Sequence, residues 1–178
     1  MITAKKFAFF TWPLLASVLL TSCGGSSAKS NGSAGKEEFI EAPEQKVQAT
    51  GGFDTPITTP DGQSYSLSSP ALFTPGKFAS GLVIGQSFNR FSVTVKNGGT
   101  KELDLVGLIV TGTTASGACV DIFDGDNKME GAPQTPLAVG ASITFNWALS
   151  CAGKSGEDLS IILTNSDAAL IEAKGKLS

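Results

Sequence analysis

The sequence predicts an all-β domain, folded as an antiparallel β-sandwich of about seven or eight short strands. Runs rich in Val, Ile, Thr and Phe recur through residues 53–178, separated by Gly, Pro, Asn and Asp. Several of these runs alternate apolar with polar residues at a period of two, the pattern of a half-buried strand. No helical pattern of about ten or more residues interrupts them, which favours a sandwich over a mixed fold.

Each strand can be placed on one run of this kind. In chain order the expected strands lie near 65–67, 78–84, 91–95, 103–113, 118–123, 143–149, 159–163 and 170–173. The segment 103–113 is apolar on both faces around Gly107, as in a central strand with a bend or bulge. Residues 168–177 contain Ala, Leu, Glu and Lys, which favour a helix, but Gly175 and the short length favour a terminal strand.

Residues 1–22 have the features of a targeting segment. Two lysines precede the apolar run 7–20, which is shorter than the ~20 residues needed to span a bilayer. The run ends in Leu-Thr-Ser-Cys at 20–23, which resembles the lipobox of bacterial lipoproteins. The resemblance implies removal of 1–22 and attachment of a diacylglyceryl group to Cys23. The expected location is the cell envelope, with the protein anchored to a membrane on its extracytoplasmic side. The alternative is an ordinary secretory signal.

Residues 23–52 differ in composition from the rest of the chain. The first part is Gly, Ser, Ala and Asn, and the second part is mostly charged or polar. Such a segment buries too little apolar area to offset the entropy lost on folding, so it is expected to be a disordered tether. The folded domain is therefore expected to cover 53–178.

The composition excludes several classes of function. The chain has no histidine, which excludes a Ser-His-Asp triad, a Cys-His dyad and a histidine-ligated zinc ion. The formal charge is −3, and it becomes −5 once the two signal-segment lysines are removed, so nucleic acid is not an expected partner. The candidate carboxylates for acid–base hydrolysis lie on expected turns rather than in a cleft. We therefore expect no enzyme activity and no cofactor.

Two cysteines, Cys119 and Cys151, remain in an oxidising compartment once Cys23 is lipidated. A disulfide between them would enclose about 33 residues and stabilise the fold by roughly 3–4 kcal/mol. The alternative is a metal-binding or redox pair, but the chain has neither a Cys-x-x-Cys spacing nor a histidine to support it. The sequence predicts a structural disulfide.

Three stretches resemble one known family. They are FSVTVKNGG at 91–99, IFDGDNKMEGAPQTPLAVGASITFNWAL at 122–149 and LSIILT at 159–164. Their order is similar to that of the immunoglobulin-like sandwich of the immunoprotective extracellular antigen type, also called telokin-like, which is common behind lipoprotein signals. The resemblance covers about 65–175 and implies an immunoglobulin-like fold. The family has no settled activity and supplies no catalytic or ligand residues. Many of its members lack a cysteine pair such as the one found here.

One acidic cluster concentrates oxygen ligands in the domain. Its members are Asp121, Asp124, Asp126, Asn127 and Glu130. Calcium takes 6–8 oxygen ligands, so Asp121, Asp124 and Asp126 are weak calcium candidates. The spacing differs from that of an EF-hand loop, and Asp-Gly is the usual dipeptide of a hairpin. A solvated turn without metal is the favoured interpretation.

Two functions remain open. The first is a lipid-anchored binding module of the cell surface, for adhesion or envelope assembly, which contacts a protein through strand edges or loops and requires an exposed apolar patch. The second is an accessory carrier of a small ligand or metal for an envelope transporter, which requires a concave pocket with converging polar groups. We favour the first, because small sandwiches fill their interior with side chains. Trp147 is expected in that interior, whereas the sequence leaves the environment of Tyr65 open.

Overall fold

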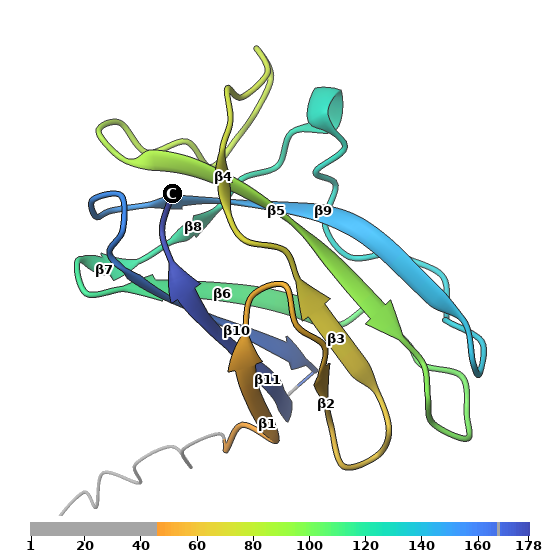
Figure 1. The fold of residues 1–178 in the computed structure, drawn as a ribbon. Helices are drawn as coiled ribbons and strands as arrows, with labels where there is room; N and C mark the ends of the chain where they lie inside the picture. Colours follow the sequence, from red (N-terminus) through yellow and green to blue (C-terminus); the bar gives the residue numbers. More distant parts are fainter. Residues whose placement is uncertain (1–45, 167) are drawn as a thin grey trace, which may run out of the picture. The chain divides into compact units, whose positions relative to one another are not determined.

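The computed structural model describes residues 46–166 and 168–178, which form two β-sheets packed as a sandwich (Figure 1). The predicted signal segment, Cys23 and most of the predicted tether lie outside these residues. The described part of the chain contains no helix with the length and apolar character needed to cross a bilayer. The two packed β-sheets confirm the all-β sandwich predicted from the sequence.

The first sheet has five strands in the order β1-β11-β10-β6-β7. Their bounds are Ala49–Gly52 for β1, Ala168–Lys176 for β11, Asp158–Asn165 for β10, Leu108–Thr114 for β6 and Gly117–Ala118 for β7. Neighbouring strands are antiparallel, except that β1 runs parallel to β11.

The second sheet has the order β2-β3-β5-β9-β8, and a further strand, β4, also pairs with β5. The bounds are Ile57–Thr58 for β2, Ser64–Leu67 for β3, Ala71–Leu72 for β4, Ser87–Lys96 for β5, Val120–Asp121 for β8 and Ser142–Cys151 for β9. A single 3-10 turn, Gly125–Asn127, lies between β8 and β9.

The core lies between the two sheets because each long strand turns alternate side chains inward. In β6 the residues alternate strictly between buried and exposed. Across β5 and β9 the inward residues face one another in register, for example Phe91 opposite Trp147 and Val93 opposite Phe145. Tyr65, whose environment the sequence left open, is 1% exposed and belongs to this core. Burial, and to a lesser degree the charge of Asp61, raises the pKa of Tyr65 to about 12.

Five of the expected strands are present where the sequence placed them. They are 65–67, 91–95, 143–149, 159–163 and 170–173. The last of these is a strand and not a helix, because it completes a ladder with β10 and buries Ile171 and Ala173.

Three expectations about strands are corrected by the structure. The segment 78–84 is part of a loop, paired only through a single bridge between Ser80 and Phe123. Within 103–113 the strand begins at Leu108, after a turn at Gly107, and Ile109 is half-exposed, so the strand is not apolar on two buried faces. The segment 118–123 is divided at Cys119, because the chain leaves β7 in one sheet and enters β8 in the other.

The predicted start of the domain at residue 53 is also corrected. Residues 49–52, assigned to the tether from their composition, form β1 and pair with 171–174 of β11. The Gln48 N–H extends this contact by donating to the carbonyl of Leu170 at 3.2 Å. A strand of sequence Ala-Thr-Gly-Gly pairs through its backbone, so its side-chain composition gives little sign of it.

Cys119 and Cys151 form the predicted disulfide, with their Cα atoms 4.4 Å apart. Cys119 is the residue at which the chain crosses between sheets, and Cys151 is the last residue of β9. The bond therefore fixes the crossing to the end of β9, one of the two long strands of the second sheet.

Candidate interaction surfaces

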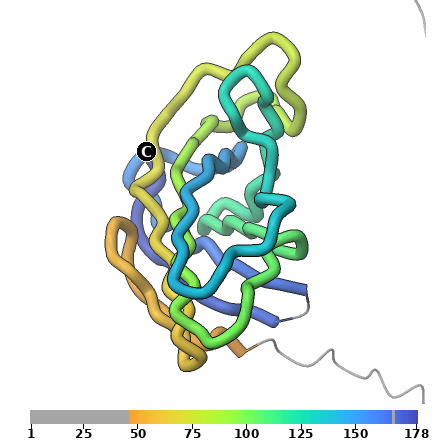
Figure 2. The backbone as a smooth tube through the Cα atoms, turned by 90° about the vertical axis from the view of Figure 1, so that its right-hand side faces the viewer, coloured from red at the N-terminus to blue at the C-terminus, as the bar shows by residue number. Residues whose placement is uncertain are grey.

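Two long connections meet at one end of the sandwich. Residues 73–86 join β4 to β5, and residues 122–131 lie between β8 and β9; we call the two segments together the loop tip. Figures 1 and 2 show them side by side, at the end of the domain opposite to the one where the described chain begins. The backbone N–H groups and carbonyls of Ser80 and Phe123 exchange hydrogen bonds of 2.9 and 3.2 Å between them.

The loop tip carries large apolar side chains on its outside. Phe78 is 82% exposed and Ile84 is fully exposed, while Leu82 and Phe123 are about half-exposed. The ammonium group of Lys77 stands 5.5 Å from the centre of the Phe78 ring, which brings one positive charge to this surface. Large apolar side chains exposed on two adjoining loops are typical of a contact surface.

A small apolar cluster supports the loop tip from beneath. Ile122, Met129 and Ala148 are buried in it, and Phe73, Ala79 and Phe88 pack against it. Since Phe88 and Ala148 lie on β5 and β9, the loops are packed against the second sheet. The exposed residues therefore project from an ordered base.

Asp124 organises the two loops by hydrogen bonding. One of its oxygens, Oδ2, accepts from the backbone N–H of Gly76 at 2.7 Å and from the side-chain amide of Asn127 at 2.7 Å. These bonds hold the pKa of the Asp124 carboxyl below its usual value, and the bond from Gly76 has the largest effect. Gly76 also lies against Asp126, so a side chain at position 76 would meet both carboxylates. Asp124 thus joins segments that are 48 residues apart.

Asp121 has a different partner. Its Oδ1 accepts a 2.9 Å hydrogen bond from the indole N–H of Trp147, which is buried in the core as predicted and packs edge-on against Phe145. Burial raises the pKa of Asp121, and the bond from Trp147 offsets part of that rise.

The structure does not bring the acidic cluster together as a cation cage. Asp126 and Glu130 are exposed, and Asp121 and Asp124 are engaged with different partners. Across residues 46–166 and 168–178, no three side chains of the His, Cys, Asp or Glu type are grouped so that they could hold a metal ion. Of the five residues, Asp124 and Asn127 hold the two loops together by hydrogen bonds, and Asp121 bonds to Trp147 instead.

Because the two pKa values are shifted in opposite directions, removing the charge of Asp121 or of Asp124 should have opposite effects on the free energy of unfolding at pH 7. A raised pKa means that folded Asp121 binds a proton more tightly than the unfolded chain does, so its contribution to stability falls as pH rises through the folded pKa. For Asp124 the pKa is lowered, so its contribution is present above the ordinary value near 3.8 and is lost as pH falls through the folded pKa. We expect Asp121→Asn to increase, and Asp124→Asn to decrease, the free energy of unfolding at pH 7.

Urea denaturation of both variants and the parent between pH 3 and pH 8 checks this prediction. The two differences from the parent should have opposite signs at pH 7, and both should shrink towards acid pH. Changes of the same sign at pH 7 would contradict the assignment of the two carboxyl environments.

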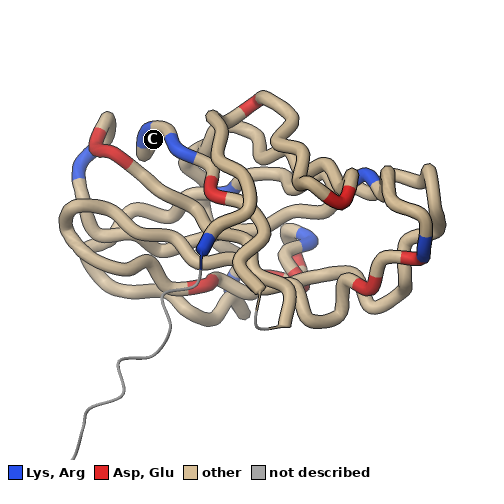
Figure 3. The backbone as a smooth tube through the Cα atoms, turned by 90° about the horizontal axis from the view of Figure 1, so that it is seen from below, with Lys and Arg blue, Asp and Glu red and all other residues tan. Residues whose placement is uncertain are grey.

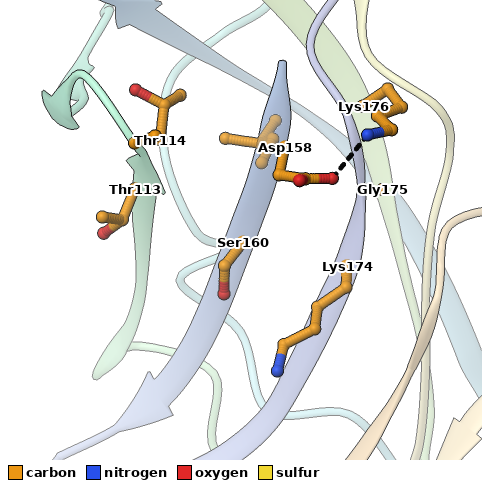
Figure 4. A pocket seen from close by; sticks show the side chains of 9 residues that line it. Thr113, Thr114, Asp158, Ser160, Lys174, Gly175 and Lys176 are labelled. Atoms are coloured by element: carbon orange, nitrogen blue, oxygen red, sulfur yellow. Dashed lines mark hydrogen bonds and ion pairs between the residues drawn. The ribbon is translucent and has the colours of Figure 1, made fainter. Parts of the chain in front are cut away.

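A hollow of about 410 Å³ lies across the first sheet, over β6, β10 and β11 (Figure 4). Both lysines beside it are already paired: Lys176 lies 2.6 Å from Asp158, as the dashed line marks, and Lys174 lies 3.1 Å from Glu172. Elsewhere too, Lys and Arg are interspersed with Asp and Glu along the described chain (Figure 3). This hollow gives little support to the carrier hypothesis, because its cations are neutralised by the chain itself.

The fold places the chain in the class of two-sheet β-sandwich proteins. No protein-family model matches the chain, and no curated protein matches it. Among solved structures, it resembles a candidate lipoprotein (ycdA) of Bacillus subtilis subsp. subtilis str. 168, with a TM-score of 0.51 and 13% identity. That match covers 74% of this chain but 39% of the Bacillus protein, so the chain spans well under half of it.

Two further structures have lower TM-scores. The secreted protein MPT63 of Mycobacterium tuberculosis has a TM-score of 0.49 and 16% identity, over 71% of this chain and 96% of that one. An uncharacterized β-sandwich protein of Clostridium difficile 630 has a TM-score of 0.43 and 11% identity, over 75% and 97%. At these identities the likeness concerns the fold alone.

Proposed function

We propose that the chain is an exported, non-catalytic binding module, anchored to a membrane through a lipid on Cys23, which contacts a protein partner through the loop tip. The observation that carries this proposal is the exposure of Phe78 and Ile84 on loops that are packed and hydrogen-bonded beneath. A preformed apolar surface loses little conformational entropy on binding, which favours association with another protein.

The loops support this role better than the strand edges do. The outermost strands β2, β7 and β8 have two residues each, and β1 has four. Natural proteins use such short edge strands to limit edge-to-edge association, although β8 covers only Leu149 and Ser150 of β9 and β7 covers only Thr113 and Thr114 of β6. We assign the contact with the partner to the loop tip because of its exposed apolar side chains.

The position of the loop tip also suits an N-terminal anchor. The described chain begins at the end of the sandwich opposite to the loop tip (Figures 1 and 2). A lipid attached through the N-terminal segment would join the domain at that end, which leaves the loop tip free to face away from the anchoring membrane.

Photocrosslinking in a lipoprotein-competent bacterium tests the contact. A photoreactive phenylalanine in place of Phe78 should give a discrete adduct with one protein, and the double substitution Phe78→Ser and Ile84→Ser should abolish co-purification of that protein. The matched control is Val106→Ser with Val139→Ser, since both valines are about half-exposed but lie outside the loop tip. If the control pair loses the partner equally, or the loop-tip pair retains it, the proposed surface is wrong.

The anchor has its own test. The full-length chain should enter the detergent phase on phase separation, because two acyl chains give stable membrane attachment. Cys23→Ser should move the protein to the aqueous phase with its melting temperature unchanged. A serine variant that remains in the detergent phase would rule out Cys23 as the anchor.

A further inference from the structure

A second hollow, of about 340 Å³, lies on the outer face of the second sheet, where the chain passes from β3 to β4. Leu67 is paired with Val93 and Ala71 with Arg90, so three residues, 68–70, stand opposite two on β5. This extra residue makes a β-bulge, which pushes the chain away from β5 and leaves the hollow. The backbone N–H of Ser92, left without a strand partner there, donates instead to the Ser68 hydroxyl at 2.9 Å.

Arg90 borders this hollow and is the only arginine in the chain. Its neighbours directly across both adjacent strands are alanines, Ala71 and Ala148, and Arg90 itself is exposed. Within the part of the chain that the structure describes, its guanidinium makes no ion pair and no hydrogen bond. A guanidinium presents a planar fork of donors that matches the two oxygens of a carboxylate or phosphate.

The other polar groups around the hollow can also donate to such a ligand. Asn146 faces it, and its side-chain amide has no hydrogen bond to any described residue. The hydroxyls of Ser68 and Ser92 are 3.4 Å apart, at the long limit of a hydrogen bond. The Ser92 hydroxyl can therefore turn towards a ligand, while that of Ser68 keeps its bond from the Ser92 N–H.

One carboxylate, that of Asp54, stands beside the hollow, and both of its oxygens are occupied. Oδ1 accepts from the backbone N–H of Ser69 at 3.1 Å, and Oδ2 accepts from the Ser69 hydroxyl at 2.6 Å. Asp54 thus fixes the bulge, and it makes no ion pair with Arg90.

We propose that this hollow binds an oxyanion, the carboxylate or phosphate group of a ligand, through the guanidinium of Arg90, with the Asn146 amide and the Ser92 hydroxyl as further donors. The paired lysines of the hollow on the first sheet provide the contrast, because there the chain itself neutralises each cation. The site is separate from the loop tip, so its test is independent of the proposed partner contact.

The experiment is an NMR titration of the non-lipidated mature chain, residues 23–178 with Cys23→Ser, at constant ionic strength. Inorganic phosphate and acetate are added in separate series, which distinguish the two oxyanions. The amide resonances of Ser68, Ser92 and Asn146 should move and saturate with at least one of them. Arg90→Gln should weaken binding by about tenfold.

Lys96→Gln is the matched control. Lys96 is an exposed cation on the same strand, so its removal changes the net charge equally but leaves the hollow intact. Binding by this variant should stay within about twofold of the parent, and circular dichroism should show that both variants are folded. Shifts that do not saturate with either anion, or equal binding by parent and Arg90→Gln, would overturn the proposal.

Discussion

Replacing both Cys119 and Cys151 with alanine is expected to lower the free energy of unfolding by about 2–5 kcal/mol. The bond closes a segment with a sequence separation of 32, so its loss releases the unfolded chain from a large constraint. It also fixes the point where the chain changes sheets. Cys151 is buried, and Cys119 lies so close to β6 that a side chain on Gly112 would meet its sulfur atom and Leu149.

Chemical denaturation of the double variant and of the reduced parent measures this loss. Both should keep the circular dichroism of a β-protein at low temperature, because the sheets pair without the bond. Alkylation and mass spectrometry of the oxidised, non-lipidated chain provide the direct check. Two alkylated thiols among Cys119 and Cys151 would contradict the disulfide.

Gly81→Ala should have the second large effect. Gly81 has a φ of +81°, and a Cβ atom there would lie 1.9 Å from the carbonyl oxygen of Asp121. The substitution therefore adds a clash with backbone to the cost of a left-handed conformation, which alone is about 1–2 kcal/mol. Since Gly81 follows Ser80, which bridges to Phe123, the variant should separate the two halves of the loop tip.

Gly85→Ala is the matched control for this experiment. Gly85 has nearly the same φ, +84°, but apart from its chain neighbours no residue has an atom within 4 Å of the position that a Cβ would take. Both variants should therefore lose the conformational contribution, and only Gly81→Ala should also speed hydrogen exchange at Ser80 and Phe123 and weaken the crosslink from position 78. Equal losses in the two variants would show that the close approach of the two loops contributes nothing.

The sequence correctly predicted those strands in which every second side chain packs in the core. The prediction was wrong where a segment has the apolar residues of a strand but lies on the surface. Residues 143–149 alternate because every second side chain faces the opposite sheet. Residues 78–84 carry equally large apolar side chains, but these face outward, and no local pattern distinguishes an exposed apolar residue from a buried one. The one local indication against a strand here was the glycine at position 81. Its φ is positive in the structure, which a strand does not allow.

The site residues show the same division. The acidic cluster was found from composition, but the contact of Asp124 with Gly76 joins residues far apart in the chain and has no local signature. The hollow beside Arg90 arises from a count of residues between two pairings on β5, which appears only when the sheet is assembled. Both features depend on contacts between residues that are far apart in the chain.

The parallel pairing of β1 with β11 has a mechanical consequence. The chain enters β1 from the end opposite to the loop tip and runs along the sheet beside residues 171–174 (Figure 1). If a partner holds the loop tip while the anchor pulls on the N-terminal side, the force is directed along the strand. The hydrogen bonds of the β1–β11 ladder then carry the load together in shear, whereas a perpendicular pull would open them one after another. Under such tension the time before β1 separates from β11 depends on an unfolding rate, which the hydrogen bonds of these four residues determine.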